Sequence, residues 1–349
     1  MKENRFVLMS AITEQTWNFL LRNVSPDDFV QPVCYETFIE FFNKRALKKN
    51  WLRPYVTAMF YECLSNHPFT EIMPVIAVSE VFNISTYQSN SVFDKKLGPT
   101  PINIDGMNQF IASYLSMGMA NRIIMQSGFD DKVKLSLLDL LNQCNEKIYK
   151  GQSLDINMLV LDNAETMLND ECFYHDLYSK RCDLIAGASV EFCALSAAIA
   201  AKIDDDDTVD SLCRLACQWG GIMQIINDLS DYFVIRGNRG RYFDVRADKL
   251  TLPLFLILKQ ESSDNLNNIV SSIRKYDDNA LEAFFNRFIF KDSPVVMVIF
   301  DMLKSKWGLC KKEILNLGLS KEFAQGLFES TFLNTYSRRL FSNKLIKWL

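Results

Sequence analysis

Two aspartates and an asparagine interrupt a largely apolar stretch at "QIINDLSDYF", residues 224–233. If this stretch is helical, Asn227 and Asp231 are four positions apart on one face, with Asp228 beside them. Carboxylate oxygens suit a hard cation such as Mg²⁺, which proteins often hold with one or two carboxylates and the phosphates of a substrate. The spacing therefore predicts a metal site at a helix end. A helix cap with an ion-paired loop is the structural alternative.

A second acidic position follows in "RGNRGRYFDVRADKLTLP", residues 236–253. Asp244 is flanked there by basic residues, namely Arg239, Arg241, Arg246 and Lys249. Carboxylates beside a basic cluster suit a metal–diphosphate ligand, because the metal ions and the cationic side chains share the negative charge of the diphosphate. Together the two stretches predict one arm of a diphosphate-binding site.

The segments that must position these residues have apolar residues at helical spacing. The clearest of them are residues 53–66, 101–127, 131–152, 180–203 and 209–233. Alternation typical of strands is scarce, and neither an internal repeat nor a low-complexity linker divides the chain. The pattern predicts an all-α protein with a single domain, residues 1–349, folded as one helical bundle.

Composition excludes several other classes of site. The 349 residues have a formal net charge of -4, which gives no reason to expect a nucleic-acid partner. Nine cysteines without paired spacing argue against a disulfide framework, and two histidines argue against histidine-based metal or nucleophile sites. Neither an 18-residue apolar run nor a signal-peptide pattern is found, so we expect a soluble cytoplasmic protein without a transmembrane segment.

The order of the motifs resembles the trans-isoprenyl diphosphate synthases, the polyprenyl synthetase family. The second aspartate-rich region of that family is similar to residues 220–254. Earlier landmarks fall in the family's order at "WLRPYVTAMFYE", "YKGQSLDI" and "YSKRCDLIAGA". The resemblance covers about residues 45–260, and the C-terminal part, about 261–349, has no marked motif.

The resemblance implies a class I isoprenoid (terpenoid) synthase bundle with a central apolar cavity. In such enzymes Mg²⁺ helps to bind an allylic prenyl diphosphate, which ionises to a carbocation in a water-poor cavity. Isopentenyl diphosphate then attacks the carbocation. The resemblance also implies a homodimer, or a heterodimer with a related synthase.

The allylic-diphosphate side of the resemblance is largely kept. Its implied metal ligands are Asp228, Asp231 and Asp244, with Asn227 where the family has its first aspartate. The implied diphosphate-binding residues are Lys180, Arg239, Lys249 and, on the isopentenyl side, Arg53. Lys180, Gln224 and Lys249 are the candidate catalytic residues, and Gln152 and Asp155 match the family's GQxxD motif.

The other side departs from the family. The first aspartate-rich motif becomes residues 90–94, "NSVFD", where only Asp94 is a carboxylate and Asn90 replaces an aspartate. In the acceptor pocket Asn50 and Trp51 replace a lysine and an arginine, and Asn83 replaces a histidine. Ser85 and Thr86 stand where bulky aromatic side chains shorten the product in the family, so their small size predicts a deep cavity, with an ordinary helix surface as the alternative.

These losses favour an enzyme that ionises an allylic diphosphate and then cyclises it, as a terpene synthase does, or transfers the prenyl group to an acceptor other than isopentenyl diphosphate. Each charge-assisted contact contributes about 1.5–3 kcal/mol, so a second diphosphate site would hardly lose three such groups. Two alternatives stay open: a catalytically silent partner subunit of a synthase, and a divergent chain-elongating synthase. Substrate length, product and acceptor do not follow from the sequence.

Overall fold

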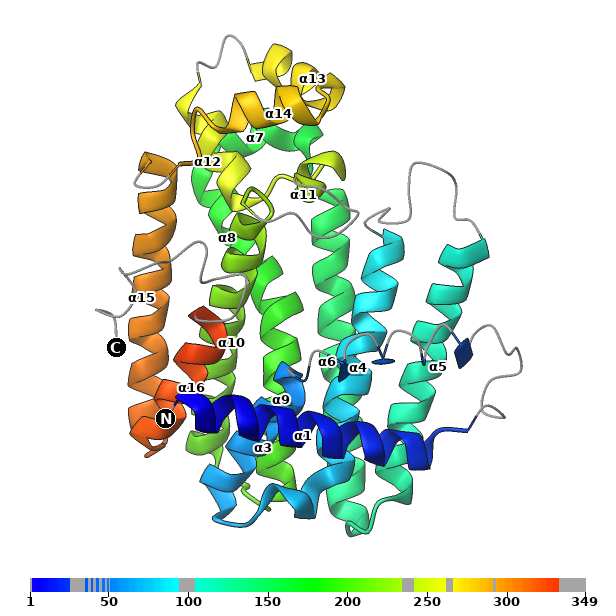
Figure 1. Ribbon diagram of the computed structural model, residues 1–349. Coiled ribbons are helices and arrows are strands. Elements are labelled where there is room, and N and C mark those ends of the chain that lie inside the picture. Colours follow the sequence, from blue (N-terminus) through cyan, green and yellow to red (C-terminus); the bar gives the residue numbers. More distant parts are fainter. Residues whose placement is uncertain are drawn as a thin grey trace. The chain divides into compact units, whose positions relative to one another are not determined.

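Helices make up most of the computed structural model, which describes residues 2–25, 35–36, 39, 42–43, 46–47, 49, 51–93, 104–233, 242–261, 266–290 and 293–332 (Figure 1). Within these ranges the β-structure is one isolated antiparallel bridge between Val160 and Lys249. The predicted all-α class is confirmed.

The elements follow the expected helical segments closely. They are α1 (Lys2–Asn23), α3 (Leu52–Ser65), η2 (Phe69–Ile72), α4 (Met73–Phe93), α5 (Ile104–Gln126), α6 (Asp131–Asn157), η3 (Leu161–Asn163), α7 (Ala164–Asn169), α8 (Glu171–Cys182), the π-helical turn η4 (Asp183–Gly187), α9 (Ala188–Ala200), α10 (Asp206–Ser230), α11 (Phe243–Arg246), α12 (Leu252–Gln260), α13 (Leu266–Lys275), α14 (Asp278–Phe285), α15 (Pro294–Asn316) and α16 (Lys321–Phe332).

The chain groups into two compact units. Unit 1 comprises residues 1–146, 188–216 and 313–327, and unit 2 comprises residues 147–187, 217–312 and 328–349. The boundaries fall within α6, α10, α15 and α16, and between η4 and α9. The single domain therefore stays a prediction.

In unit 1, α4 packs along α5, and α3 packs against α9 and α4 (Figure 1). The helix α1 contacts both α3 and α4. Its Trp17 stacks on Phe42 and meets Trp51 edge-on, with ring centroids 5.9 and 6.2 Å apart. Trp51 is 1% exposed, so this aromatic cluster belongs to the core of the unit.

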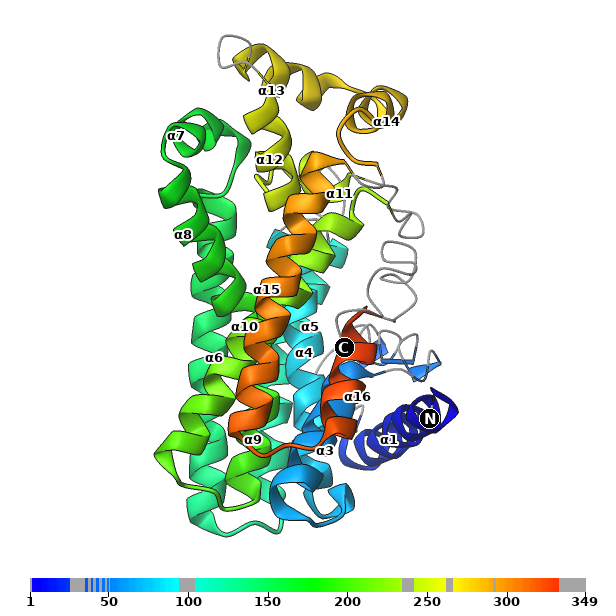
Figure 2. The same ribbon diagram turned by 90° about the vertical axis from the view of Figure 1, so that its left-hand side faces the viewer.

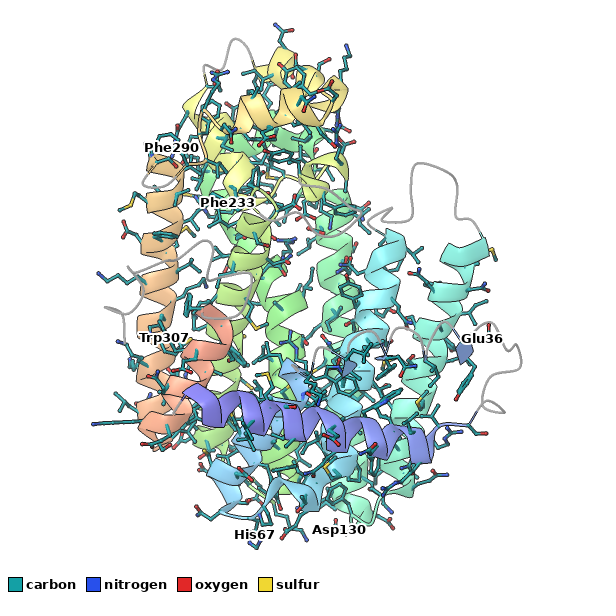
Figure 3. The ribbon with its side chains drawn as sticks, in the orientation of Figure 1. Glu36, His67, Asp130, Phe233, Phe290 and Trp307 are labelled. Atoms are coloured by element: carbon teal, nitrogen blue, oxygen red, sulfur yellow. The ribbon has the colours of Figure 1, made fainter. Side chains whose placement is uncertain are left out.

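In unit 2, α7 packs on both α8 and α12 (Figure 2). Tyr174 of α8 lies flat against Phe255 of α12, with ring centroids 3.7 Å apart. Farther along the chain, Trp307 of α15, labelled in Figure 3, packs its ring against Phe328 and Phe332 of α16. Large aromatic side chains of this kind supply much of the buried apolar area.

The segment 180–203 departs from the expected uninterrupted α-helix. It contains the end of α8, the π-helical turn η4 and then α9. Such a turn inserts extra backbone into a helix and often marks a functional region. The continuous helical stretch Glu171–Ala200 is long and apolar enough to span a membrane, but 72% of its most apolar window is buried, as in the core helix of a soluble protein.

Two glycines allow the helices of unit 2 to approach η4 closely. A Cβ at Gly220 of α10 would lie 2.5 Å from Gly187 Cα and 2.7 Å from the Ala186 carbonyl carbon. A Cβ at Gly151 of α6 would lie 2.6 Å from Ile185 Cγ1. Because both glycines lack this atom, α6 and α10 can each pack against the turn that follows α8.

We expect Gly220→Ala to destabilise the protein by about 1–3 kcal/mol or more, because the methyl group meets backbone atoms that cannot rotate away. The measurement is urea unfolding followed by circular dichroism. Gly118→Ala in α5 is the matched control, since a Cβ there has no neighbour within 4 Å. Its replacement should be neutral or stabilising by about 0.5–1 kcal/mol. Equal effects of the two substitutions would contradict the close approach.

Candidate functional site

A buried network of charged side chains lies where α6, α8 and α10 meet in unit 2. Asp228 of α10 is fully buried and accepts hydrogen bonds from three donors. Arg181 Nη1 and the Tyr178 hydroxyl, both from α8, donate to its Oδ2 at 2.8 Å each. Gln224 Nε2, one turn earlier in α10, donates to its Oδ1 at 2.7 Å. Both oxygens of Asp228 are thus engaged inside the protein.

Asp155 of α6 is the second carboxylate of the network. Arg181 Nε lies 2.6 Å from its Oδ1, an ion pair whose N–H is not well directed for a hydrogen bond. Lys249 Nζ donates to its Oδ2 at 2.5 Å. One guanidinium therefore joins two carboxylates from different helices, and the four charged groups sum to a formal charge of zero. We call Asp155, Arg181, Asp228 and Lys249 the four-charge cluster.

The main chain around Lys249 sets the position of this lysine. Leu161 N donates to the Asp248 carbonyl, and Leu250 N donates to the Leu159 carbonyl, both at 2.9 Å. These bonds flank the isolated bridge between Val160 and Lys249. The segment after α11 is thereby fixed beside the end of α6, and the Lys249 side chain, 6% exposed, reaches Asp155.

Electrostatics keep Asp155 and Arg181 charged. Burial by itself would raise the pKa of Asp155, but Arg181 and Lys249 outweigh it and hold that pKa below its usual value. Burial would likewise lower the pKa of Arg181, and the two carboxylates raise it instead. Burial and the charge of Asp228 raise the pKa of Tyr178 well above its usual value, so the phenol keeps its proton and acts as a donor.

Asp231 connects the end of α10 to the start of α11. The helix ends at Ser230, so Asp231 lies in the turn that follows, where it is 2% exposed. Its Oδ2 accepts the backbone N–H of Asp244 at 2.9 Å, and its carbonyl accepts that of Tyr242 at 3.0 Å. The two predicted metal ligands Asp231 and Asp244 are therefore close in space, and the Asp244 side chain is half-buried.

The remaining predicted residues of this arm differ from one another in their exposure to solvent. Asn227 and Lys180 are exposed, whereas Gln224 and Gln152 are buried. The sequence placed Asn227 and Asp231 on one helical face, but α10 ends between them, and their exposure differs accordingly. Lys180 points away from the interior, because the neighbouring Arg181 occupies the buried face of α8.

Arg181 and Tyr178 were missed by the sequence analysis. The apolar face of α8 includes Tyr174 and Leu177, and positions four later on the helix share that face. Tyr178 and Arg181 occupy those positions, so helical periodicity was the signal that could have identified them. The motif comparison instead drew attention to the adjacent lysine.

The acceptor-side predictions fall in unit 1. Trp51 is part of the aromatic core described above, and half-buried Arg53 donates from Nε to Ser189 Oγ at 2.8 Å. Ser85 is buried and donates to the Ser113 carbonyl of α5 at 2.9 Å, so its hydroxyl bridges two helices. Thr86, Asn83 and Asn90 are half-buried on α4. The lining of a cavity by Ser85 and Thr86 stays a prediction.

Three predicted residues, Asn50, Asp94 and Arg239, lie outside the described residues. Within the ranges that are described, there is no group of three or more histidine, cysteine, aspartate or glutamate side chains arranged to hold a metal ion. A cleft of about 240 Å³ in unit 2 lies elsewhere, between α7 and α13. It is lined partly by Arg274, which Asp162 and Asp248 already engage, and we assign it no role.

Comparison with known proteins gives a family match. The family model described as polyprenyl synthetase matches residues 102–287. No curated protein sequence matches the chain. Several solved structures share the fold over nearly their whole length, at identities that carry information on the fold alone.

One of these is a polyprenyl synthase from Caulobacter crescentus CB15 complexed with calcium and isoprenyl diphosphate, with TM-score 0.74, 18% identity and coverage of 96% of this chain and 98% of the other. A decaprenyl diphosphate synthase from Rhodobacter capsulatus has TM-score 0.72, 16% identity and coverage of 98% and 100%. A geranylgeranyl pyrophosphate synthetase from Pyrococcus horikoshii Ot3 has TM-score 0.71, 13% identity and coverage of 96% and 99%. The class I isoprenoid synthase bundle is thus confirmed.

Asp155→Asn should destabilise the protein by about 3–5 kcal/mol at pH 7, because it leaves two buried cations short of a partner. The pKa of Asp155 is lowered in the folded state, so its contribution is complete above about pH 3.9, the unfolded value, and is lost as the pH falls further. The difference between natural protein and variant should therefore shrink below about pH 4. Urea unfolding across this pH range measures both effects.

Asp162→Asn is the control, since Asp162 is 76% exposed in its ion pair with Arg274. Its loss should cost less than about 1 kcal/mol. A similar loss in both variants, or a difference that grows in acid, would be incompatible with a charged, buried Asp155.

Proposed function

The chain belongs to the polyprenyl synthetase family, and from that premise we propose that it is a prenyltransferase-type enzyme that binds an allylic prenyl diphosphate and directs the prenyl group away from isopentenyl diphosphate. The prenyl group is cyclised within the chain's cavity or passes to another acceptor. Two of the structural neighbours are named as a geranylgeranyl pyrophosphate synthetase and a decaprenyl diphosphate synthase. Ordinary chain elongation with isopentenyl diphosphate is the activity that the altered acceptor side disfavours.

The environment of Trp51 carries this proposal. The family resemblance puts a cation at this position to bind the acceptor's diphosphate, but here an indole is 1% exposed among Trp17 and Phe42. A residue in such a core cannot bind a diphosphate. Of the cations in the family motif, Arg53 is kept, and its Nε already donates to Ser189. A single arginine provides much less electrostatic stabilisation for a diphosphate than a set of cations does.

The allylic diphosphate is proposed to bind near the end of α10 and the start of α11. Lys180 of α8 is exposed, and both Lys180 and Arg239 are retained as proposed contacts from the sequence resemblance. Lys249 and Asp228, by contrast, neutralise their partners inside the four-charge cluster. We therefore propose that Lys249 and Gln224 do not touch the diphosphate. They instead hold Asp155 and Asp228 in position in the protein interior.

Mg²⁺ is proposed as the metal, on a reduced set of ligands. Asp228 does not fit such a role, since it is fully buried with both oxygens engaged. Asp244, with Asp231 beside it, and exposed Asn227 fit one side of a metal site that the substrate's phosphates would complete. When bound, Mg²⁺ would offset the charge of the leaving diphosphate. The Caulobacter structure is complexed with both calcium and isoprenyl diphosphate, which supports a divalent ion in this proposal.

A silent partner subunit is the second candidate. The observation that favours it is the internal neutralisation of Asp228, which removes one of the acids expected to serve chemistry. A subunit that contributes only packing would tolerate such a change. We place the silent subunit second because the exposed Lys180 and the Asp231–Asp244 pair would then have no function.

We also propose that the enzyme is located in the cytoplasm.

Turnover assays distinguish these functions. We expect pyrophosphate release, and a hydrocarbon or alcohol product, from geranyl, farnesyl or geranylgeranyl diphosphate with Mg²⁺ and without isopentenyl diphosphate. Pyrophosphate assay and analysis of the organic extract are the measurements. Product that forms only with isopentenyl diphosphate would establish chain elongation, and no turnover with any of the substrates would favour the silent subunit.

Asp244→Ala should abolish turnover and leave the fold intact, because its side chain is only half-buried. Asp248→Ala, four residues later and exposed, is its matched control and should keep activity. Asp228→Ala should also abolish turnover, but through loss of the four-charge cluster, which thermal unfolding would reveal.

A dimer with a second copy of the chain, or with a related synthase, is proposed through α5. Apolar residues at helical spacing are exposed on this helix of unit 1: Met107 (55%), Phe110 (45%), Ile111 (42%) and Tyr114 (78%). An exposed apolar stripe of this kind is typical of an interaction surface. In unit 1 the opposite side of α5 packs on α4.

Phe110→Glu should convert a homodimer to monomer, because the charge would be buried in the interface. Light scattering coupled to size-exclusion chromatography measures the mass. Leu135→Glu on α6, where the leucine is 64% exposed, is the control and should keep the mass of the natural protein. A natural protein that is monomeric both alone and with a related synthase would contradict this surface.

A further inference from the structure

Arg181 connects two buried carboxylates that come from different helices, Asp155 of α6 and Asp228 of α10. We propose that its guanidinium is the permanent counter-ion of this carboxylate pair and occupies the place that a divalent cation would otherwise take. The pair then binds no metal in the natural chain, and Arg181 keeps the three helices together in every state. This inference concerns the cluster itself and does not rest on the proposed function.

The charge balance of the cluster supports the inference. Two carboxylates meet two cations, and all four side chains are at most 7% exposed. A divalent ion added to this neutral, buried group would have no net negative charge to attract it. It would also be repelled by a guanidinium that already contacts both carboxylates. Binding of metal by Asp228 is therefore unfavourable while Arg181 is present.

The occupancy of the carboxylate oxygens points the same way. Asp228 accepts from Arg181, Tyr178 and Gln224, and Asp155 is engaged by Arg181 and Lys249. A metal would have to displace these donors in a site closed to water. Arg181 instead contacts both carboxylates at once, Asp228 through a hydrogen bond from Nη1 and Asp155 through the ion pair of Nε.

Removal of the guanidinium should allow the Asp155–Asp228 pair to bind a divalent cation. Arg181→Thr leaves two carboxylates against one lysine, a net negative charge in a buried site. One turn before Asp155, Gln152 is 5% exposed, and its Oε1 has no hydrogen-bond partner. The variant would thus contain two carboxylates and an amide oxygen on α6 and α10, the types of ligand that Mg²⁺ and Mn²⁺ accept.

Thermal unfolding with and without metal tests the proposal. In the absence of any diphosphate, Mn²⁺ or EDTA should change the midpoint of the natural protein and of Asp228→Asn by the same amount. Arg181→Thr should unfold several degrees lower in EDTA and regain much of that loss in millimolar Mn²⁺. If this variant folds only when Mn²⁺ is present, the result supports the proposal equally.

Arg274→Thr is the matched control, because Arg274 also bridges two aspartates, Asp162 and Asp248, but at the surface. Its midpoint should change little and should not acquire a dependence on Mn²⁺. The proposal is overturned if Mn²⁺ stabilises the natural protein and Asp228→Asn removes that stabilisation. It is also overturned if Arg181→Thr gains no stability from Mn²⁺, or does not fold with or without it.

Discussion

The ion pairs of Arg181 with Asp155 and Asp228 are the interaction on which the rest of unit 2 depends. Transfer of each charge from water to a protein interior costs several kcal/mol, so none of these groups would be buried alone. Their mutual attraction and the hydrogen bonds of Tyr178 and Gln224 offset that cost. Because the charges come from α6, α8 and α10, the cluster forms only when these helices have the observed relative positions.

The backbone allows α6 and α10 to come close enough to the end of α8 for these charges to make contact. Gly151 and Gly220 allow α6 and α10 to approach the π-helical turn after α8, and each lies within a few turns of its helix's aspartate. The main-chain bonds around Lys249 then place the fourth charge. Small residues, a helical insertion and a two-residue bridge thus position a polar centre that the apolar pattern alone does not specify.

The same constraint gives the aspartates of the aspartate-rich region two separate environments. Asp228 serves the interior, whereas Asn227 is exposed and Asp244 is half-buried. Residues adjacent in sequence therefore belong to different environments, one structural and one accessible to a ligand. On the acceptor side Trp51 is likewise buried, because it packs against Trp17 and Phe42 in an aromatic core. The environment of Trp51 supports the proposed departure from chain elongation, whereas the neutralised Asp228 is the observation that favours the silent subunit.

Helical periodicity determined most of the fold, because apolar spacing is a local property: α3, α5, α6 and α10 begin and end within a few residues of the expected segments. The order of the sequence motifs was likewise enough to identify the family. The partners of each buried charge were decided by tertiary structure. Helical periodicity places Arg181, and not its neighbour Lys180, on the apolar face of α8, but only the tertiary structure brings Arg181 to carboxylates of α6 and α10. The reason is physical: a buried charge is stable only with partners, and those partners come from distant parts of the chain.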